Sequence, residues 1–303
     1  MSKTKFEIKK LSELPLDPLS LLLWGPAKSG KTHILGTLGK RLLIINVDGT
    51  GLNTLTNPTY LNKYPESKDV YTVSVNEVLK GYVPESPEAF DNVKTVMEQA
   101  VIELKDEIDS VAIDSASSWH RLAIFKAFEI NQVMMPAGNA EARAKNLNAM
   151  VPTVNEYRVA MELMLQAVVG CQDLCKNHNK NFILTAHERR VYTERSKIGE
   201  SLKLDKIMPW FQGVEKNPDG IAGLFDLVWH TEVFGNANKV EHVVRIAGDD
   251  ARTVGMRFQG VFKDNKGEPN VIIKNPNLKD LFNQINSARK EGIKTMVTFN
   301  STV

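Results

Sequence analysis

The chain has 303 residues, of which 42% are hydrophobic and 24% charged, and its formal net charge is +2. This composition indicates an ordinary globular protein and excludes a strongly basic chain that would bind nucleic acid over its whole surface. No apolar stretch approaches the ~20 residues of a membrane span, and the polar start MSKTKFEIKKLSELPLD does not resemble a secretory signal. Two cysteines give no disulfide framework. We therefore expect a cytoplasmic protein without membrane contact.

Apolar runs of strand length alternate along the chain with segments of helical periodicity. Continuous apolar strands separated by helices predict an α/β fold, with a mostly parallel sheet covered on both faces. After residue 225 the pattern changes to strands with short turns, FDLVWHTEV, EHVVRIAG and RTVGMRF, which predict an antiparallel C-terminal extension of the same sheet. The expected strands are 21–24, 42–47, 70–75, 110–113 and 182–186, and the expected helices lie near 32–39, 87–107, 117–133, 151–178 and 277–291.

These elements predict a single domain. Residues 1–17 form an N-terminal extension, and residues 18–260 form the core. Residues 261–303 are expected to form a hairpin, a helix and a tail that pack on the core. Gly, Asn and Pro make two stretches, near 134–150 and 188–224, look like irregular insertion loops.

The stretch GPAKSGKT matches the phosphate-binding pattern G-x-x-x-x-G-K-[ST] between an expected strand and an expected helix. Glycines let the backbone wrap an anion, and the amides and the helix N-terminus supply positive ends. Lys31 is expected to bridge the β- and γ-phosphates of ATP, and the Thr32 hydroxyl to bind Mg²⁺. The alternative is a Gly-rich turn without a ligand. The predicted nucleotide-binding residues are Gly25, Pro26, Ala27, Lys28, Ser29, Gly30, Lys31, Thr32 and His33.

Three polar residues follow other expected strands and complete the predicted catalytic set with Lys31. Asp114 ends the strand in SVAIDS and is a second Mg²⁺ ligand, unless it only caps the next helix. Asp48 follows LLIINV and could deprotonate an attacking water, or could belong to an Asp-Gly turn. His187 follows NFILTA and could sense the γ-phosphate, or could be an ordinary surface residue.

The order of these parts resembles the RecA-type recombinase core over roughly residues 18 to 260. GPAKSGKT is similar to the recombinase phosphate loop, and VAIDS to its Walker-B strand. The resemblance places Asp48 where that family has its catalytic glutamate, and His187 where RecA has the glutamine that links nucleotide state to DNA binding. We expect no separate DNA-binding domain at either end of the core, which departs from the recombinase pattern. In this the chain resembles the small RecA-core ATPases of tailed phages, which are associated with single-strand annealing and recombination. For a phage protein the location would be the host cytoplasm.

The resemblance implies DNA contacts from the two predicted loops. Between residues 188 and 206, six basic residues stand against four acidic ones, so charge alone is a weak argument for phosphate contacts. Tyr192, Trp210 and Phe211 could stack on bases, or could belong to the core. The candidate DNA-binding residues are Arg143, Lys145, Arg189, Arg190, Arg195 and Lys197.

RecA-like ATPases usually receive a cation from a neighbouring subunit, which implies a homo-oligomer, either a ring or a filament. Arg245, Arg252 and Arg257 lie in the late strand region where such groups occur, and each could equally be a solvated strand-edge arginine. Such an arginine stabilises the charge of the transition state.

Cys171, Cys175 and His178 share one face of a predicted helix and suggest a zinc site. Three ligands on one straight helix fit a single metal ion poorly, so we interpret the cysteines as core residues.

The sequence thus predicts an ATP- and Mg²⁺-dependent ATPase, with slow hydrolysis because Asp48 is shorter than glutamate. The expected role is DNA recombination on single-stranded DNA, of the annealing or strand-pairing type. A single-strand-binding protein is a candidate partner of the protein in this role. Two alternatives stay open, a ring helicase or translocase on the same core and an ATPase switch that gates a protein partner. Small-molecule kinases rank last, because no lid-like arginine cluster is evident.

Overall fold

A computed structural model describes residues 15–48, 51–75, 87–134, 152–192, 204–211, 219–236, 239–248, 252–258, 260–264 and 266–300. Within them, a ten-stranded sheet runs in the order β10-β8-β7-β1-β5-β4-β2-β3, with β6 paired to β5 and β9 to β7. The strands are β1 (Ser20–Gly25), β2 (Leu42–Asn46), β3 (Tyr71–Ser74), β4 (Ser110–Asp114), β5 (Asn181–Tyr192), β6 (Leu204–Pro209), β7 (Leu227–Asn236), β8 (Lys239–Arg245), β9 (Gly255–Met256) and β10 (Ile272–Lys274).

The centre of the sheet is parallel. β1 pairs in parallel with β5 and β7, and the β5–β4, β4–β2 and β2–β3 pairs are parallel as well. The β7–β8, β8–β10 and β7–β9 pairs are antiparallel. The predicted fold class, a mostly parallel α/β sheet with an antiparallel C-terminal extension, is confirmed. Because parallel strands end at one edge, the carboxyl ends of β1, β2, β4 and β5 lie together.

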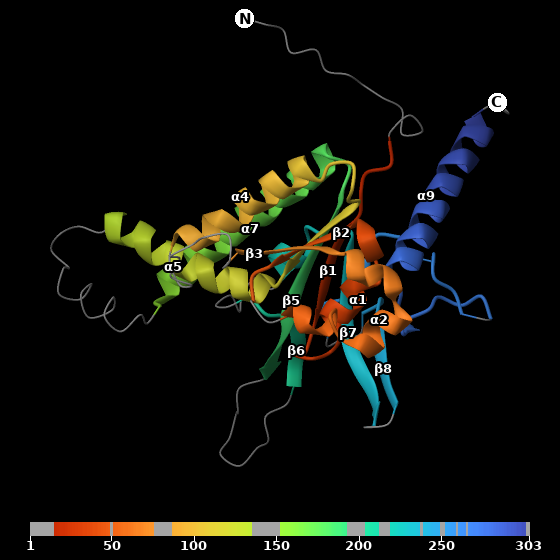
Figure 1. The fold of residues 1–303 in the computed structure, drawn as a ribbon, viewed down its shortest axis with the longest axis horizontal. Helices are drawn as coiled ribbons and strands as arrows, with labels where there is room; N and C mark the ends of the chain where they lie inside the picture. Colours follow the sequence, from red (N-terminus) through yellow and green to blue (C-terminus); the bar gives the residue numbers. More distant parts are fainter. Residues whose placement is uncertain are drawn as a thin grey trace, which may run out of the picture.

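Helices cover both faces of the sheet (Figure 1). One layer contains α4 (Glu88–Glu103), α5 (Ala116–Met134) and α7 (Val154–Asn177). The other contains α1 (Lys31–Gly36), α2 (Pro58–Lys63) and α9 (Leu278–Asn300), and the short α8 (Asp219–Ala222) precedes β7. Three 3₁₀ helices, η2 (Gly39–Arg41), η3 (Gly51–Thr54) and η4 (Pro65–Asp69), connect the early elements.

The alternation of side chains along β1 divides the core in two. Leu22 and Trp24 face the cluster under α4, α5 and α7, whereas Leu21 and Leu23 face the cluster under α1 and α9. All four are fully buried. Successive strand residues point to opposite faces, so a run of apolar residues is required wherever both faces are covered.

The C-terminal helix α9 joins the second cluster. Leu278, Leu281, Phe282 and Ile285 are buried against it, with the spacing of one helix face. Residues 278–285 therefore pack on the core rather than forming a separate unit.

The prediction of an irregular loop over 188–224 is wrong for the part that the structure describes. β5 continues past the sheet to Tyr192 and pairs with β6, forming a two-stranded ribbon. The alternating sequence of this ribbon is short and strongly charged, which concealed its strand character. The RTVGMRF strand is reduced to the two residues of β9. The other predicted loop, near 134–150, lies almost entirely outside the described residues.

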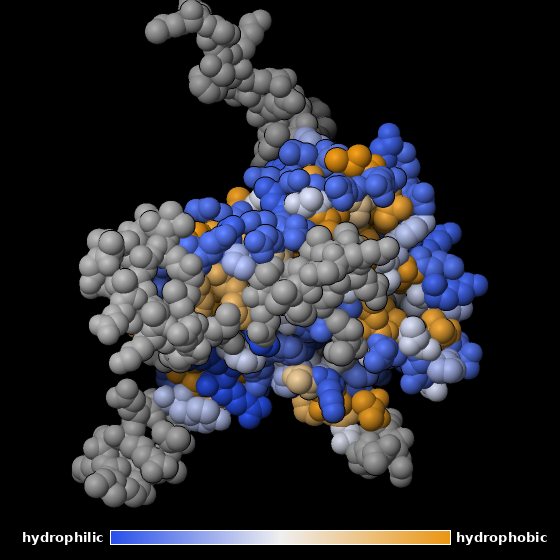
Figure 2. All heavy atoms as spheres, turned by 60° about the vertical axis from the view of Figure 1, so that its left-hand side comes forward, coloured by the Kyte–Doolittle hydropathy of each residue, from blue (hydrophilic) through white to orange (hydrophobic). Residues whose placement is uncertain are grey.

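Hydrophilic residues cover most of the described surface in Figure 2, with hydrophobic residues in separate patches. Among the described residues, no helix is both long enough and apolar enough to cross a membrane.

Candidate nucleotide-binding site

The phosphate-loop motif connects β1 to α1. Gly30 caps α1 with a φ of 91° and a ψ of 17°, a left-handed conformation that favours glycine. The loop is folded around its own lysine, because the Lys31 ammonium donates to the carbonyl oxygens of Gly25 (3.0 Å) and Pro26 (2.8 Å). Lys31 is only 7% exposed. The loop therefore holds a buried cation against two of its own carbonyl oxygens.

Burial also changes the acidity of this cation. Desolvation lowers the pKa of Lys31 to about 8, although the negative charges of Asp114, Asp48 and Glu188 oppose that shift. An anion that contacts Lys31 would replace the lost hydration and favour the ammonium form. The loop is thus suited to an anionic ligand.

Asp114 connects the phosphate loop to β5. One of its carboxylate oxygens accepts from the Thr32 hydroxyl (2.8 Å), and the other accepts from the Thr185 hydroxyl (2.5 Å). Ser115, rather than Asp114, accepts from the first turn of α5, through the Ser118 amide (3.5 Å). The cap interpretation of Asp114 is therefore not what the structure shows. The threonine and the aspartate instead present adjacent oxygen ligands at the loop.

Asp48 lies at the end of β2, next to Asp114. The backbone amide of Asp48 donates to the Asp114 carbonyl (3.4 Å), and Ser115 donates to the Asp48 carboxylate (3.1 and 3.2 Å). Ser118 donates to it as well. Burial raises the pKa of Asp48, and the charge of Asp114 raises it further. A carboxylate with a raised pKa and a fixed position is suited to accept a proton.

His187 lies on the other side of Asp48. Its Nε2 is 3.9 Å from an Asp48 carboxylate oxygen, and its backbone amide donates to Ser117 Oγ (3.0 Å). Burial lowers the pKa of His187, and the charge of Lys31 lowers it further. The imidazole is thus mainly neutral near neutral pH and acts as a polar group beside Asp48. The structure brings all four predicted catalytic residues together.

Other residues around the loop carried no recognisable motif. Ser29 and Thr231 share a hydrogen bond of 2.5 Å, and an added Cβ on Gly25 would lie 2.3 Å from the Thr231 hydroxyl. β7 therefore packs directly against the loop. Ser29 and Thr231, like Thr185, Ser115 and Ser118, are short hydroxyl side chains whose role depends on tertiary contacts.

A cluster of rings covers the outer side of α1. The His33 ring lies 4.6 Å from Tyr60 and 4.4 Å from His242, measured between centroids. Burial lowers the pKa of His33 to about 4, so this ring is neutral. An added Cβ on Gly30 would lie 2.2 Å from His242 Nδ1. His242 thus fixes how closely β8 approaches the loop.

The three arginines predicted to act in a neighbouring subunit contact carboxylates of their own chain. Arg245 and Arg252 lie 3.4 and 3.3 Å from Glu232, and Arg257 lies 3.1 Å from Asp226.

Of the candidate DNA-binding residues, Arg189 and Arg190 lie on β5, where Arg190 donates to Glu188 (2.6 Å). The predicted aromatic residues divide: Tyr192 and Trp210 are 46% and 38% exposed, whereas Phe211 is buried. The remaining candidates, Arg143, Lys145, Arg195 and Lys197, lie outside the described residues.

Mg²⁺ fits the oxygen ligands of Thr32 and Asp114, because this ion is commonly bound through one or two protein oxygens plus phosphate and water. Within the described ranges, no group of three or more His, Cys, Asp and Glu could hold a metal ion by itself. Cys171 and Cys175 are buried in the core, and burial raises the pKa of Cys171 to about 12. Both thiols are thus protonated core groups.

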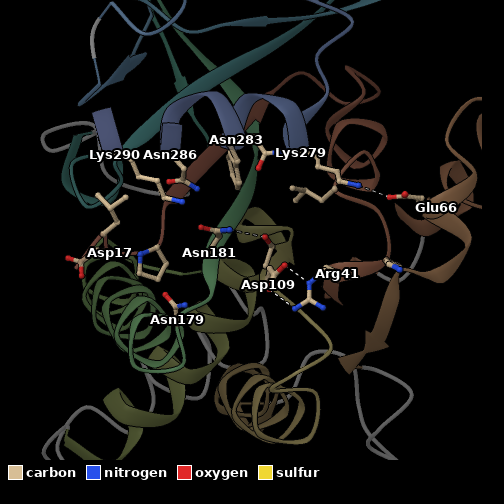
Figure 3. A pocket seen from close by; sticks show the side chains of 16 residues that line it. Asp17, Arg41, Glu66, Asp109, Asn179, Asn181, Lys279, Asn283, Asn286 and Lys290 are labelled. Atoms are coloured by element: carbon tan, nitrogen blue, oxygen red, sulfur yellow. Dashed lines mark hydrogen bonds and ion pairs between the residues drawn. The ribbon is translucent and has the colours of Figure 1, made fainter. Parts of the chain in front are cut away.

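A polar cavity of about 390 Å³ lies at the opposite edge of the sheet, near the starts of β1, β4 and β5. Asn283, Asn286 and Lys290 of α9 line it across from Asn179 and Asn181 (Figure 3). None of the predicted site residues lines this cavity.

No protein-family model matches the chain, and no match is found among curated proteins. Among solved structures, the chain is similar to a KaiC-like protein, PH0186, from the hyperthermophilic archaeon Pyrococcus horikoshii OT3. The TM-score is 0.40 at 13% sequence identity, and the similarity covers 86% of this chain and 90% of that one. At this distance the functional assignment rests on the geometry of the site itself.

The close packing of the loop generates a prediction. Gly30→Ala puts a Cβ on a residue with positive φ and against His242, so we expect a loss of about 1–3 kcal/mol of unfolding free energy from the strained backbone alone. Gly255→Ala is the matched control, because nothing lies within 4 Å of an added Cβ there. Urea denaturation of both variants measures the difference, and equal stabilities would contradict the described loop conformation.

Proposed function

We propose that the protein binds ATP with Mg²⁺ and hydrolyses its γ-phosphate. The observation that carries this proposal is the convergence of Lys31, Thr32, Asp114 and Asp48 at one end of the sheet. A buried ammonium, a hydroxyl beside a carboxylate and a second carboxylate with a raised pKa are the groups that phosphoryl transfer to water requires.

Each residue has a separate task in this proposal. Lys31 exchanges its hydrogen bonds to the loop carbonyls for contacts to the phosphates, and the loop amides bind the remaining oxygens. Thr32 and Asp114 hold Mg²⁺, which when bound neutralises charge that develops on the phosphate oxygens. Asp48 orients a water molecule and accepts its proton, with His187 beside it as a hydrogen-bonding partner.

The biological role that we propose is DNA recombination on single-stranded DNA, by an assembly of identical subunits. It rests on the resemblance to the RecA-type core and on the position of the β5–β6 ribbon, which leaves the site directly after His187. A ribbon attached to the sensor residue could link nucleotide state to a bound strand.

One observation favours the alternative of an ATPase that gates a protein partner. Arg190, a candidate phosphate contact, is bonded to Glu188, which reduces the positive charge of the ribbon. The salt dependence of DNA binding separates the two roles, because phosphate contacts release counterions.

Removal of the Lys31 ammonium provides the first test. We expect Lys31→Ala to weaken MgATP binding by at least about a hundredfold in calorimetry, because a buried charged contact to phosphate is lost. The matched control is Lys94→Ala, which removes the same charge from an exposed position on α4, away from the loop, and should change the affinity little. Equal affinities of the two variants would exclude Lys31 from the site.

The pH dependence of binding follows from the lowered pKa of Lys31. Above its pKa of about 8, the free protein has lost part of its Lys31 protons, whereas bound phosphate favours the ammonium. MgATP binding at about pH 8.5 should therefore take up protons and weaken as the pH rises. Calorimetry in buffers of different ionisation enthalpy measures this uptake. Lys31→Arg, which stays charged, should show none, and an uptake of zero in the wild type would contradict the assignment.

DNA binding is tested with Arg189→Ala combined with Lys197→Ala, leaving Arg190 in place because it holds Glu188. We expect affinity for fluorescent single-stranded DNA to fall about tenfold or more, and the slope of log K against log salt to decrease by about one per lost contact. Lys68→Ala with Lys94→Ala serves as the charge-matched control. Unchanged affinity and slope would remove Arg189 and Lys197 from the interface and favour a protein partner.

A further inference from the structure

Glu188, His230 and Glu232 form a buried polar triad beside the last residues of β1, at the strand end from which the phosphate loop continues. His230 Nε2 lies 2.9 Å from a Glu188 carboxylate oxygen, and His230 Nδ1 lies 3.1 Å from a Glu232 carboxylate oxygen. The three side chains are 6%, 3% and 15% exposed. Burying two acidic side chains and a histidine costs free energy unless they are paired and hydrogen-bonded. The triad therefore needs a structural or functional explanation.

The triad lies on the opposite face of the sheet from the proposed nucleotide site. In the sheet register, Gly25 of β1 is beside His187 of β5, and Trp24 is beside His230 of β7. Since successive strand residues point to opposite faces, Glu188 shares the face of Trp24 and His230, whereas His187 faces the phosphate loop. The Trp24 and His230 rings are 4.2 Å apart. Glu188 and His230 thus join β5 to β7 across the last residues of β1.

The contacts of the two His230 ring nitrogens with the Glu188 and Glu232 carboxylates depend on how many protons the triad holds. A neutral imidazole has one N–H, and its other nitrogen is an acceptor. Both ring nitrogens face carboxylate oxygens, which are acceptors only when ionised. The closed triad therefore holds one proton more than a neutral histidine between two carboxylates. If that proton leaves, one of the two contacts becomes a contact between two acceptors, and it opens.

Charged groups from every neighbouring element surround the triad. Arg190 of β5 donates to Glu188 (2.6 Å). Arg245 of β8, and Arg252 of the segment before β9, lie within 3.4 Å of the Glu232 oxygen that faces His230. From the face of the loop, Lys31 interacts with Glu188. These cations favour the ionised form of both carboxylates, so the additional proton resides on His230.

The pKa shifts of Glu188 and His230 agree with the additional proton residing on His230. Burial would raise the pKa of Glu188, but hydrogen bonds from Arg190 and His230 outweigh it and leave that pKa below its usual value. Burial lowers the pKa of His230 and outweighs the opposing carboxylates. His230 therefore releases its second proton on the acid side of its usual range, and the triad is closed below that pH and open above it.

We propose that Glu188 and His230 are positioning residues for the ATP hydrolysis described above, whose closed triad holds β5 at Glu188 so that His187 stays aimed at Asp48. The inference rests on the proposed function. The triad is connected to the site through adjacent residues, because Glu188 directly follows His187 in the chain. The His187 carbonyl accepts from the Trp210 amide, and the His187 ring lies 3.9 Å from Asp48. Loosening Glu188 shifts the sensor without touching the phosphate loop.

Glu188→Gln tests whether the contact between residue 188 and His230 matters independently of the protonation state of His230. The glutamine amide can donate to, or accept from, His230 Nε2, so its contact survives when the imidazole is neutral. At saturating MgATP, we expect the ratio of kcat in Glu188→Gln to kcat in the wild type to be close to one at the acid end of the pH range, where the wild-type triad is closed. It should rise at least about threefold by pH 8, as the wild-type triad opens. Glu66→Gln, which removes a carboxylate paired with Lys279 away from this site, should give a flat ratio.

His230→Ala removes the centre of the triad. At the acid end of the pH range, where the wild-type triad is closed, we expect kcat to fall about tenfold with KM for ATP within about twofold of the wild type, because the phosphate contacts are retained. A change confined to KM, or a flat kcat ratio for Glu188→Gln across the pH range, overturns the positioning role.

Nitrogen-15 NMR of the histidine rings in the full-length wild type tests the proton count without any turnover. In a titration from pH 8 toward acid, we expect His230 to show one ring N–H group at pH 8 and to gain the second at a pH below the usual histidine range. A single N–H group throughout the titration of the folded wild type overturns the inference, and this outcome does not depend on how well any variant folds. Absence of ATP hydrolysis in the wild type overturns the proposed function together with the positioning role, whereas hydrolysis with a flat ratio overturns only the latter.

Discussion

A buried ammonium group organises the site. Lys31 is withdrawn from water, and its hydrogen bonds go to the carbonyls of Gly25 and Pro26, two residues of its own loop. A buried ammonium group is costly unless acceptors surround it, and the Gly25 and Pro26 carbonyls supply two of them. This arrangement requires the left-handed conformation of Gly30 and the absence of a side chain at Gly25, where Thr231 packs. The loop, the first turn of α1 and the packing of β7 are thus consequences of one buried charge.

The parallel sheet extends this constraint to the rest of the site. Because β1 and β4 end beside the middle of β5, Thr32, Asp114 and Thr185 meet in one hydrogen-bonded chain. The alternation of side chains then assigns different tasks to the two faces. The face of α1 carries the predicted catalytic residues, and the opposite face carries the Glu188–His230–Glu232 triad, which ties together the strands on either side of β1.

Much of this arrangement could be predicted from sequence, because its signals are local. The apolar strands, the Gly-Lys-Thr turn and the acid at the end of β4 each follow from neighbouring residues, and strand topology then forces Lys31, Asp114 and Asp48 together. The β5–β6 ribbon could not be predicted in this way, because its pairing depends on a distant segment with a charged, irregular pattern. The triad could not be predicted either, because Glu188 and His230 are 42 positions apart in the sequence. A single histidine or glutamate forms no sequence motif that would indicate this contact. Serine and threonine partners such as Ser118 and Thr185 were missed for the same reason.

The account is tested most directly by a crystal structure of the protein with Mg²⁺ and a non-hydrolysable ATP analogue. It predicts that the Lys31 ammonium leaves the Gly25 and Pro26 carbonyls for the β- and γ-phosphates, and that the Thr32 hydroxyl exchanges Asp114 for the metal ion. A nucleotide bound elsewhere, for example in the polar cavity beside Asn181 and Lys290, with Lys31 still bonded to its own loop, would contradict it.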